Sequence, residues 1–195
     1  MNLGIIAQTD RWGWLRVAAL ICAVAPAAPA QSDFDAPQRV FDNDRVIDPG
    51  WQTGVVMGGI GAGFVEWGAS GALRPVGIPT ADPITADAAW WEIEIATATG
   101  VLRRALLHDS VTPAAEAGVA SVRFRGSFPR AFWSFRDPAV GLEVFVEAFS
   151  PFVPHDLLAS ADPVVGFRFT VTGPPGAIRL RLRGWPGSTA IDALC

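Results

Sequence analysis

The sequence predicts an all-β protein, an antiparallel sandwich or barrel, and three observations support that prediction. Apolar and polar side chains alternate with a period of two in successive segments between residues 51 and 184. Turn-forming residues separate these segments at intervals of about 8 to 12 residues. No stretch of this region shows the periodicity of a long amphipathic helix. The 195-residue chain, 50% hydrophobic and 17% charged, is long enough to bury the core of one such domain.

The predicted strands follow one another along the chain. In WWEIEIATA (90–98), alternation places Trp91 and Ile93 on one face and Glu92 and Glu94 on the other. The later strands are VASVRFRG, RAFWSFRD, LEVFVEAF, GFRFTVTG and AIRLRLRG, and the turns between them contain Asp-Pro pairs or the sequence GPPG. We interpret the acidic residues of EIE and EVFVE as members of solvated sheet faces.

The N-terminal residues predict an exported protein, periplasmic or extracellular. Two arginines precede an apolar run at 17–24, and APAAPA then offers small residues for cleavage near Ala30. We therefore assign residues 1–30 to a signal peptide, 31–50 to an extended polar arm and 51–195 to the sandwich. Because the apolar run is shorter than the roughly 20 residues of a membrane span, we expect no stable span after cleavage. An uncleaved anchor is the alternative.

The glycine-rich segment MGGIGAGFVEWG (57–68) does not match a nucleotide-binding motif. A dinucleotide fingerprint built on Gly59 and Gly61 needs a third glycine where the chain has Phe64, and the segment lacks the lysine of a P-loop. We interpret these glycines as forming a turn, or as allowing another backbone to approach closely. A net charge of −4 without a basic cluster argues against a nucleic-acid partner.

Residue types that perform chemistry occur in patterns too weak to define a site. Glu92 and Glu94 lie about 7 Å apart if both are on one strand face, within the range of a glycosidase pair, but any i, i+2 spacing gives that distance. The triplet HDS (108–110) has the residue types of a hydrolase triad, yet neighbours on a strand point to opposite faces. Each histidine precedes an aspartate, in His108-Asp109 and His155-Asp156, but a metal site needs three or four converging ligands and nothing in the sequence shows that these pairs converge. We interpret both pairs as parts of a surface loop or turn. We predict no catalytic residue, no cofactor and no metal.

Tryptophan is frequent beyond residue 50, and the chain has no tyrosine. Exposed tryptophan rings suit carbohydrate binding, whereas buried rings commonly dominate a core. Because neighbouring residues of a strand face opposite ways, Trp90 and Trp91 should lie on different faces. The six tryptophans of this region are Trp51, Trp67, Trp90, Trp91, Trp133 and Trp185.

Two blocks of the sequence resemble a known family. PGWQTGVVMGGIGAGFVEWGASGALR (49–74) and FPRAFWSFRDPAVGLEVFVEAFSPFVPHDLLASADPVVGFRFTV (128–171) are similar to the N-terminal domain of the non-lysosomal glucosylceramidases, glycoside hydrolase family 116. The resemblance implies a β-sandwich that precedes an (α/α)6 catalytic barrel. It also implies that a retaining β-glucosidase or glucosylceramidase reaction is carried out by a carboxylate pair of that barrel.

No residue of this chain matches the barrel carboxylates, and the chain ends where the family's sandwich is expected to continue. We therefore expect a non-catalytic domain, complete or lacking strands, that braces a barrel encoded separately or lost. Alternatives are a stand-alone carbohydrate-binding sandwich for β-glucosides and an interaction module offering an edge strand. The residues expected at a domain interface or carbohydrate contact are Trp67, Trp91, His155 and Asp156.

Overall fold

The computed structural model confirms an all-β architecture of antiparallel sheets. It describes residues 2–9, 15–23, 54–60, 63–76, 89–162, 164–184 and 193–194. Among these residues the strands form three sheets of six, four and three strands, named here sheets A, C and B. Every strand pairing within the sheets is antiparallel.

Sheet A has the strand order β2-β1-β11-β10-β9-β8. Its strands β8, β9, β10 and β11 correspond to four of the predicted segments. In β9 and β10 most residues of both faces are buried. A short 3₁₀ turn at Pro138–Val140 joins β9 to β10, at the predicted Asp-Pro turn. The strands are β1 (Asn2–Thr9), β2 (Leu15–Ala23), β8 (Ser121–Ser127), β9 (Arg130–Asp137), β10 (Leu142–Phe149) and β11 (Val164–Thr172).

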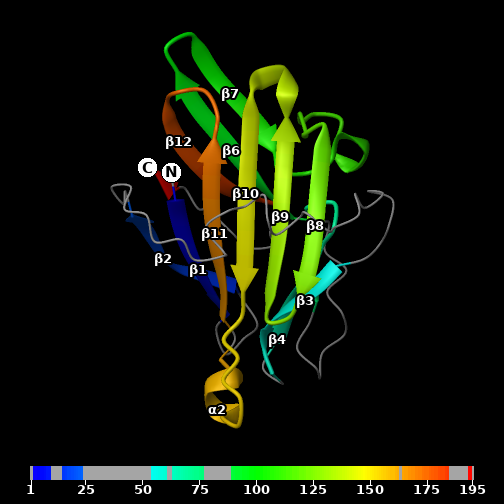
Figure 1. Ribbon diagram of the computed structural model, residues 1–195, viewed down its shortest axis with the longest axis vertical. Coiled ribbons are helices and arrows are strands. Elements are labelled where there is room, and N and C mark those ends of the chain that lie inside the picture. The colour runs from blue at the N-terminus through cyan, green and yellow to red at the C-terminus, as the bar shows by residue number, and fades with distance from the viewer. Residues whose placement is uncertain are drawn as a thin grey trace.

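Sheets C and B form the second layer. Sheet C has the order β13-β12-β6-β7, with strands β6 (Trp90–Thr97), β7 (Gly100–Ala105), β12 (Ala177–Arg183) and β13 (Ala193–Leu194). Sheet B is the meander β3 (Gly54–Gly59), β4 (Gly63–Gly68) and β5 (Leu73–Val76). In Figure 1, sheet A lies in front, with sheet C behind its upper part and β3 and β4 behind its lower part.

The core lies between these layers and depends on aromatic rings. Trp67 of β4 stacks on Trp133 of β9, with ring centroids 3.8 Å apart and planes 22° from parallel. Trp91 of β6 meets Phe169 of β11 edge to face at 5.2 Å. Both contacts join sheet A to the opposite layer, so one continuous apolar cluster stabilises the sandwich.

The turn between β4 and β5 receives the polar ends of both stacked tryptophans. The indole N–H of Trp67 donates to the Gly71 carbonyl at 2.7 Å, and that of Trp133 donates to the Gly68 carbonyl at 3.0 Å. Gly71 has a φ of 99°, and a Cβ there would strike the Leu106 carbonyl oxygen. This turn therefore needs glycine, because it combines positive φ with close backbone approach.

Residues 2–9 and 15–23 fall within the predicted signal peptide, and here they form the hairpin β1–β2 beside β11. That pairing describes the uncleaved chain. The predicted cleavage site and the arm at 31–50 lie outside the described residues, as do Trp51 and Trp185. Within the described segments, no helix has the length and apolar character needed to cross a membrane.

Candidate functional site: an apolar tip

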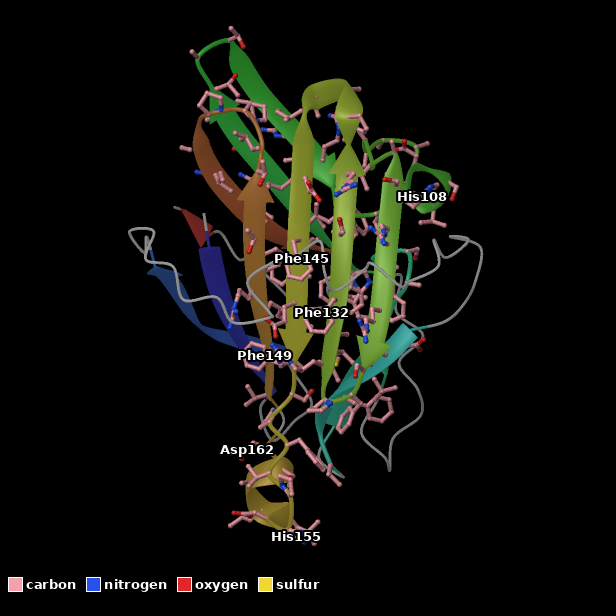
Figure 2. All side chains as sticks on the ribbon, in the orientation of Figure 1. His108, Phe132, Phe145, Phe149, His155 and Asp162 are labelled. Carbon is pink, nitrogen blue, oxygen red and sulfur yellow. The ribbon has the colours of Figure 1, made fainter. Side chains whose placement is uncertain are left out.

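One end of the sandwich carries a projecting segment that connects β10 to β11. Residues 150–162 leave sheet A, form the short helix α2 (Leu157–Ser160) and return to β11. In Figure 1, α2 lies at the far lower end of the molecule, beyond the strands. Figure 2 places His155 on this projection and Phe149 where β10 ends.

The glycine-rich end of β3 and the turn after it pack directly against this projection. The backbone N–H of Gly58 donates to Ser150 Oγ at 2.8 Å, and the N–H of Ile60 donates to the Ser160 carbonyl at 2.9 Å. Between these bonds, a Cβ on Gly59 would lie 2.6 Å from the Ala161 carbonyl carbon and nearer still to its oxygen. The interpretation that these glycines allow another backbone to approach closely is confirmed at Gly59.

Hydrogen bonds within the projection stabilise its backbone. Asp156 Oδ1 accepts from Ala159 N–H at 2.9 Å and so caps α2. Buried Ser160 uses its hydroxyl twice: it accepts from the Val153 N–H at 2.9 Å and donates to the Val153 carbonyl at 3.1 Å. His155 has a left-handed φ of 67°, which reverses the chain between Val153 and Asp156. The turn and helix are thereby preorganised.

Large apolar side chains are exposed around this projection. Leu157 and Leu158 are 77% and 86% exposed, and Phe152 meets Phe128 of the β8–β9 turn edge to face at 5.7 Å. The β8–β9 turn contains a cis peptide bond before Pro129, whose carbonyl accepts from Ser150 N–H. We call this surface the apolar tip; its members are Ile60, Phe128, Phe152, Val153, Leu157 and Leu158.

The four residues predicted for contacts divide between the core and this tip. Trp67 and Trp91 are 0% and 1% exposed, so neither presents a ring face to a ligand in this structure. His155 and Asp156 are exposed on the projection, next to Leu157. The structure thus brings His155 and Asp156 together and separates them from the two tryptophans. Trp90 is half-buried on the other face from Trp91, as alternation predicted.

The prediction that Glu92 and Glu94 belong to a solvated face was wrong. They do point away from the core strip of β6, but they are only 1% and 9% exposed. Arg103 Nε donates to Glu94 Oε2 at 2.8 Å, and Arg183 Nη2 donates to Glu92 Oε1 at 3.0 Å. Arg181 lies between the two carboxylates, 3.6 Å from Glu92 and 3.4 Å from Glu94.

Arg103 changes the acidity of Glu94. The hydrogen bond from Arg103 is the main cause that lowers the pKa of the Glu94 carboxyl below its ordinary value, although burial opposes it. An acid catalyst in a glycosidase needs the opposite shift, a raised pKa. We therefore interpret Glu94 as a structural residue that forms ion pairs with Arg103 and Arg181.

Sheet A has a similar ion-pair arrangement on its outer face. Glu147 is buried and is bound by Arg130, whose Nε lies 2.7 Å from Oε1, and by Arg168 at 3.4 Å. Phe132 and Phe145, which Figure 2 labels near the middle of this face, stack at 6.1 Å and are buried apart from the main core. Glu147 is thus also not on a solvated face, contrary to prediction.

The triplet His108-Asp109-Ser110 forms a cap. It begins the 3₁₀ turn Asp109–Val111, in agreement with our interpretation of the His-Asp pairs as parts of a surface loop or turn. His108 Nδ1 accepts from Ser110 N–H at 3.2 Å and lies 2.9 Å from Ser110 Oγ. In the described parts of the chain, no three or more His, Cys, Asp or Glu residues are grouped so that they could hold a metal ion.

The comparison with protein families identifies the domain. Residues 54–178 match the family model described as beta-glucosidase 2, glycosyl-hydrolase family 116 N-term. The chain belongs to this family of glycoside hydrolase family 116 N-terminal domains. No curated protein sequence matches the chain. The match spans both the glycine-rich turn and the projection, the two segments that meet at the apolar tip.

Sequence reasoning found the two segments of the tip but not their contact. Gly59 and Ala161 are about 100 residues apart, and no local pattern links them. The pair Leu157-Leu158 looks like core from composition alone, because leucine is usually buried. One sequence signal for this surface was available: Asp156, a helix-capping residue, is followed by Leu157-Leu158, an apolar pair that belongs to no alternating strand pattern.

Proposed function

We propose that this domain is the non-catalytic sandwich of an exported family 116 glycoside hydrolase and that it braces the catalytic part of that enzyme. Membership of the family's N-terminal domain supports this role. The observation that supports this proposal most directly is that the glutamate carboxylates of the strands are engaged in ion pairs. Glu92, Glu94 and Glu147, all buried, are bound by arginines from neighbouring strands.

A glycosidase pair needs two carboxyl groups that flank a sugar, one of them able to hold a proton. The hydrogen bond from Arg103 lowers the pKa of the Glu94 carboxyl, which favours the ionised form over the protonated form that an acid catalyst needs. The substrate class, β-glucosides, therefore belongs in this proposal to the catalytic part, which the family resemblance implies to be a helical barrel. The buried rings of Trp67 and Trp91 give no support to an independent sugar-binding role.

Hydrolysis of an aryl β-glucoside by the purified chain tests the non-catalytic assignment. We expect no release of aglycone above the buffer control. Glu92→Gln and Glu94→Gln variants should give the same null result. Activity that is present in the natural chain and lost in either variant would overturn the proposal.

A further inference from the structure

We propose that β11 becomes a strand-pairing edge once residues 1–30 are removed, and that a second copy of the chain occupies it; this inference rests on the export included in the proposed function. In the uncleaved chain β11 lies between β10 and β1, as Figure 1 shows. The pairing with β1 joins residues 2–8 to residues 164–170. Cleavage near Ala30 takes β1 away and leaves this side of β11 without the strand that occupies it in the described sheet.

The sequence of β11 is that of an interior strand. Exposed sheet edges are usually protected by charged side chains or proline, because their unpaired backbone groups recruit other strands. The edge strands β8 of sheet A and β7 of sheet C follow this rule, since each carries two arginines. Residues 164–170, VVGFRFT, include no proline, and their one charged side chain, Arg168, lies 3.4 Å from Glu147. This composition suits a strand that is paired on both sides.

The inner face of the β11 edge is apolar. Val165, Phe167 and Phe169 belong to the core and are 3%, 2% and 0% exposed while β1 is in place. Loss of an adjacent strand uncovers apolar surface, and a new strand buries it again. In an antiparallel pairing of two copies about Phe167, that ring faces its own counterpart and Val165 faces the other copy's Phe169. Aromatic pairs and pairs of an aromatic with a β-branched residue stabilise neighbouring strands.

The outer face of the edge is compatible with the same register. Gly166 lies opposite the other copy's Arg168, and Val164 lies opposite its Thr170. No like charges face each other, so the repulsion that opposes strand pairing is absent between these positions. The arginines of β8 protect the other edge of sheet A, so pairing stops at two copies.

The test is the mass of the processed chain in solution, measured by sedimentation equilibrium after secretion from a bacterial host with the natural N-terminus. Intact mass spectrometry establishes that residues 1–30 have been removed. The uncleaved chain, made by cell-free synthesis without membranes, is the comparison, because β1 fills its β11 edge. We expect the processed chain to be dimeric at micromolar concentrations and the uncleaved chain to be monomeric.

Paired substitutions at the outer positions test the register. Val164→Lys with Thr170→Lys places lysines opposite each other on both sides of the two-fold axis, whereas Val164→Glu with Thr170→Lys places opposite charges there. The matched control, Ser121→Lys with Ser127→Lys, puts two lysines on β8, the other edge of sheet A. We expect the two opposed lysine pairs to raise the dimer dissociation constant about tenfold, and the glutamate–lysine variant and the control to remain dimeric. Circular dichroism and thermal denaturation check that all chains fold alike.

The outcomes separate this inference from the proposed function. A monomeric processed chain would overturn the dimer and leave the non-catalytic role intact, because hydrolysis of an aryl β-glucoside tests that role separately. A dimer that every variant forms equally, or that the uncleaved chain forms as readily, would place the interface elsewhere and overturn the assignment to β11. Failure of the host to export and cleave the chain would overturn the exported state in the proposed function and the inference with it.

Discussion

Substitution of Gly59 by alanine should destabilise the fold, because Gly59 lies where the β3–β4 turn touches the projection. The new Cβ would lie 2.6 Å from the Ala161 carbonyl carbon and 2.7 Å from the Asp162 carbonyl carbon, whereas ordinary contacts begin at 3.4 Å. Both neighbours are backbone atoms, and the Ala161 carbonyl oxygen would be nearer still, so the chain must move by more than roughly 0.8 Å, the difference between 3.4 and 2.6 Å. Overpacking of this kind costs about 1 to 3 kcal/mol.

The same movement stretches the hydrogen bond from Ile60 N–H to the Ser160 carbonyl, now 2.9 Å, whose loss adds about 0.5 to 1.5 kcal/mol. The free energy of unfolding should therefore fall by about 2 to 4 kcal/mol. With a urea m-value of about 2 kcal/mol/M, the unfolding midpoint moves down by about 1 to 2 M. Urea titration followed by tryptophan fluorescence measures this shift.

Gly173→Ala is the matched control. A Cβ on Gly173 comes closest to the ends of two flexible side chains, Leu142 Cδ1 at 3.1 Å and Ile95 Cδ1 at 3.6 Å, and lies at an ordinary contact distance of 3.9 Å from the Gly141 carbonyl oxygen. We expect its unfolding free energy to stay within about 1 kcal/mol of the natural chain. A Gly59→Ala variant as stable as the natural chain, or a Gly173→Ala variant as unstable as Gly59→Ala, would refute the close-approach explanation.

Three further predictions concern the ion pairs and the stacked tryptophans. Because Arg103 lowers the folded-state pKa of Glu94 below its ordinary value of 4.5, the ionised form stabilises the fold above that pH, and this stability is lost as the pH falls through the lower folded-state pKa. Glu94→Gln should therefore reduce the acid-induced loss of stability that urea titrations show as the pH falls below 4.5. Trp133→Phe removes the indole hydrogen bond to the β4–β5 turn and part of the stack, so its unfolding free energy should fall by about 1 to 3 kcal/mol in urea titration. Asp137→Asn breaks the 2.6 Å pair with Arg104, in which both side chains are largely buried, and should cost about 3 to 5 kcal/mol by the same titration.

Each of these three has a distinguishing control or outcome. For Asp137, the control is Glu143→Gln, whose pair with Arg136 is more than one-third exposed on both sides and should cost less than about 1 kcal/mol. Equal losses for the two variants would contradict the role assigned to burial. An unchanged pH profile in Glu94→Gln would contradict its folded-state pKa shift, and an unchanged midpoint in Trp133→Phe would contradict the importance of the indole bond.

Period-two alternation predicted the sandwich well because each strand presents one face to a single core. Trp91, Ile93 and Ile95 point inward as the pattern required. Alternation could not predict that Glu92 and Glu94 would be buried, because their cover comes from arginines on β7 and β12, and the register of those strands is set by the whole sheet. A strand pattern gives the direction of a side chain, but neighbouring strands determine its exposure.

The sequence predicted local properties of the segments that form the candidate site, but it did not predict the contacts between those segments. The glycine spacing excluded a nucleotide and favoured a close approach, but the approaching segment at Ala161 depends on tertiary structure. Likewise, the hydrogen bond from the indole of buried Trp67 requires the Gly71 carbonyl to face the core, and the sequence of the β4–β5 turn does not specify that direction. Exposed Leu157 and Leu158 contradict the usual burial of leucine, and such exceptions to local rules are expected at functional surfaces.

The most direct test of the bracing role is the aryl β-glucosidase activity of a family 116 catalytic part, measured alone and with increasing amounts of the purified chain. We expect the chain alone to be inactive and to raise the activity or thermal stability of the catalytic part until the effect saturates. Hydrolysis by the chain alone, or no effect of the chain at any concentration, would contradict the role proposed for this domain.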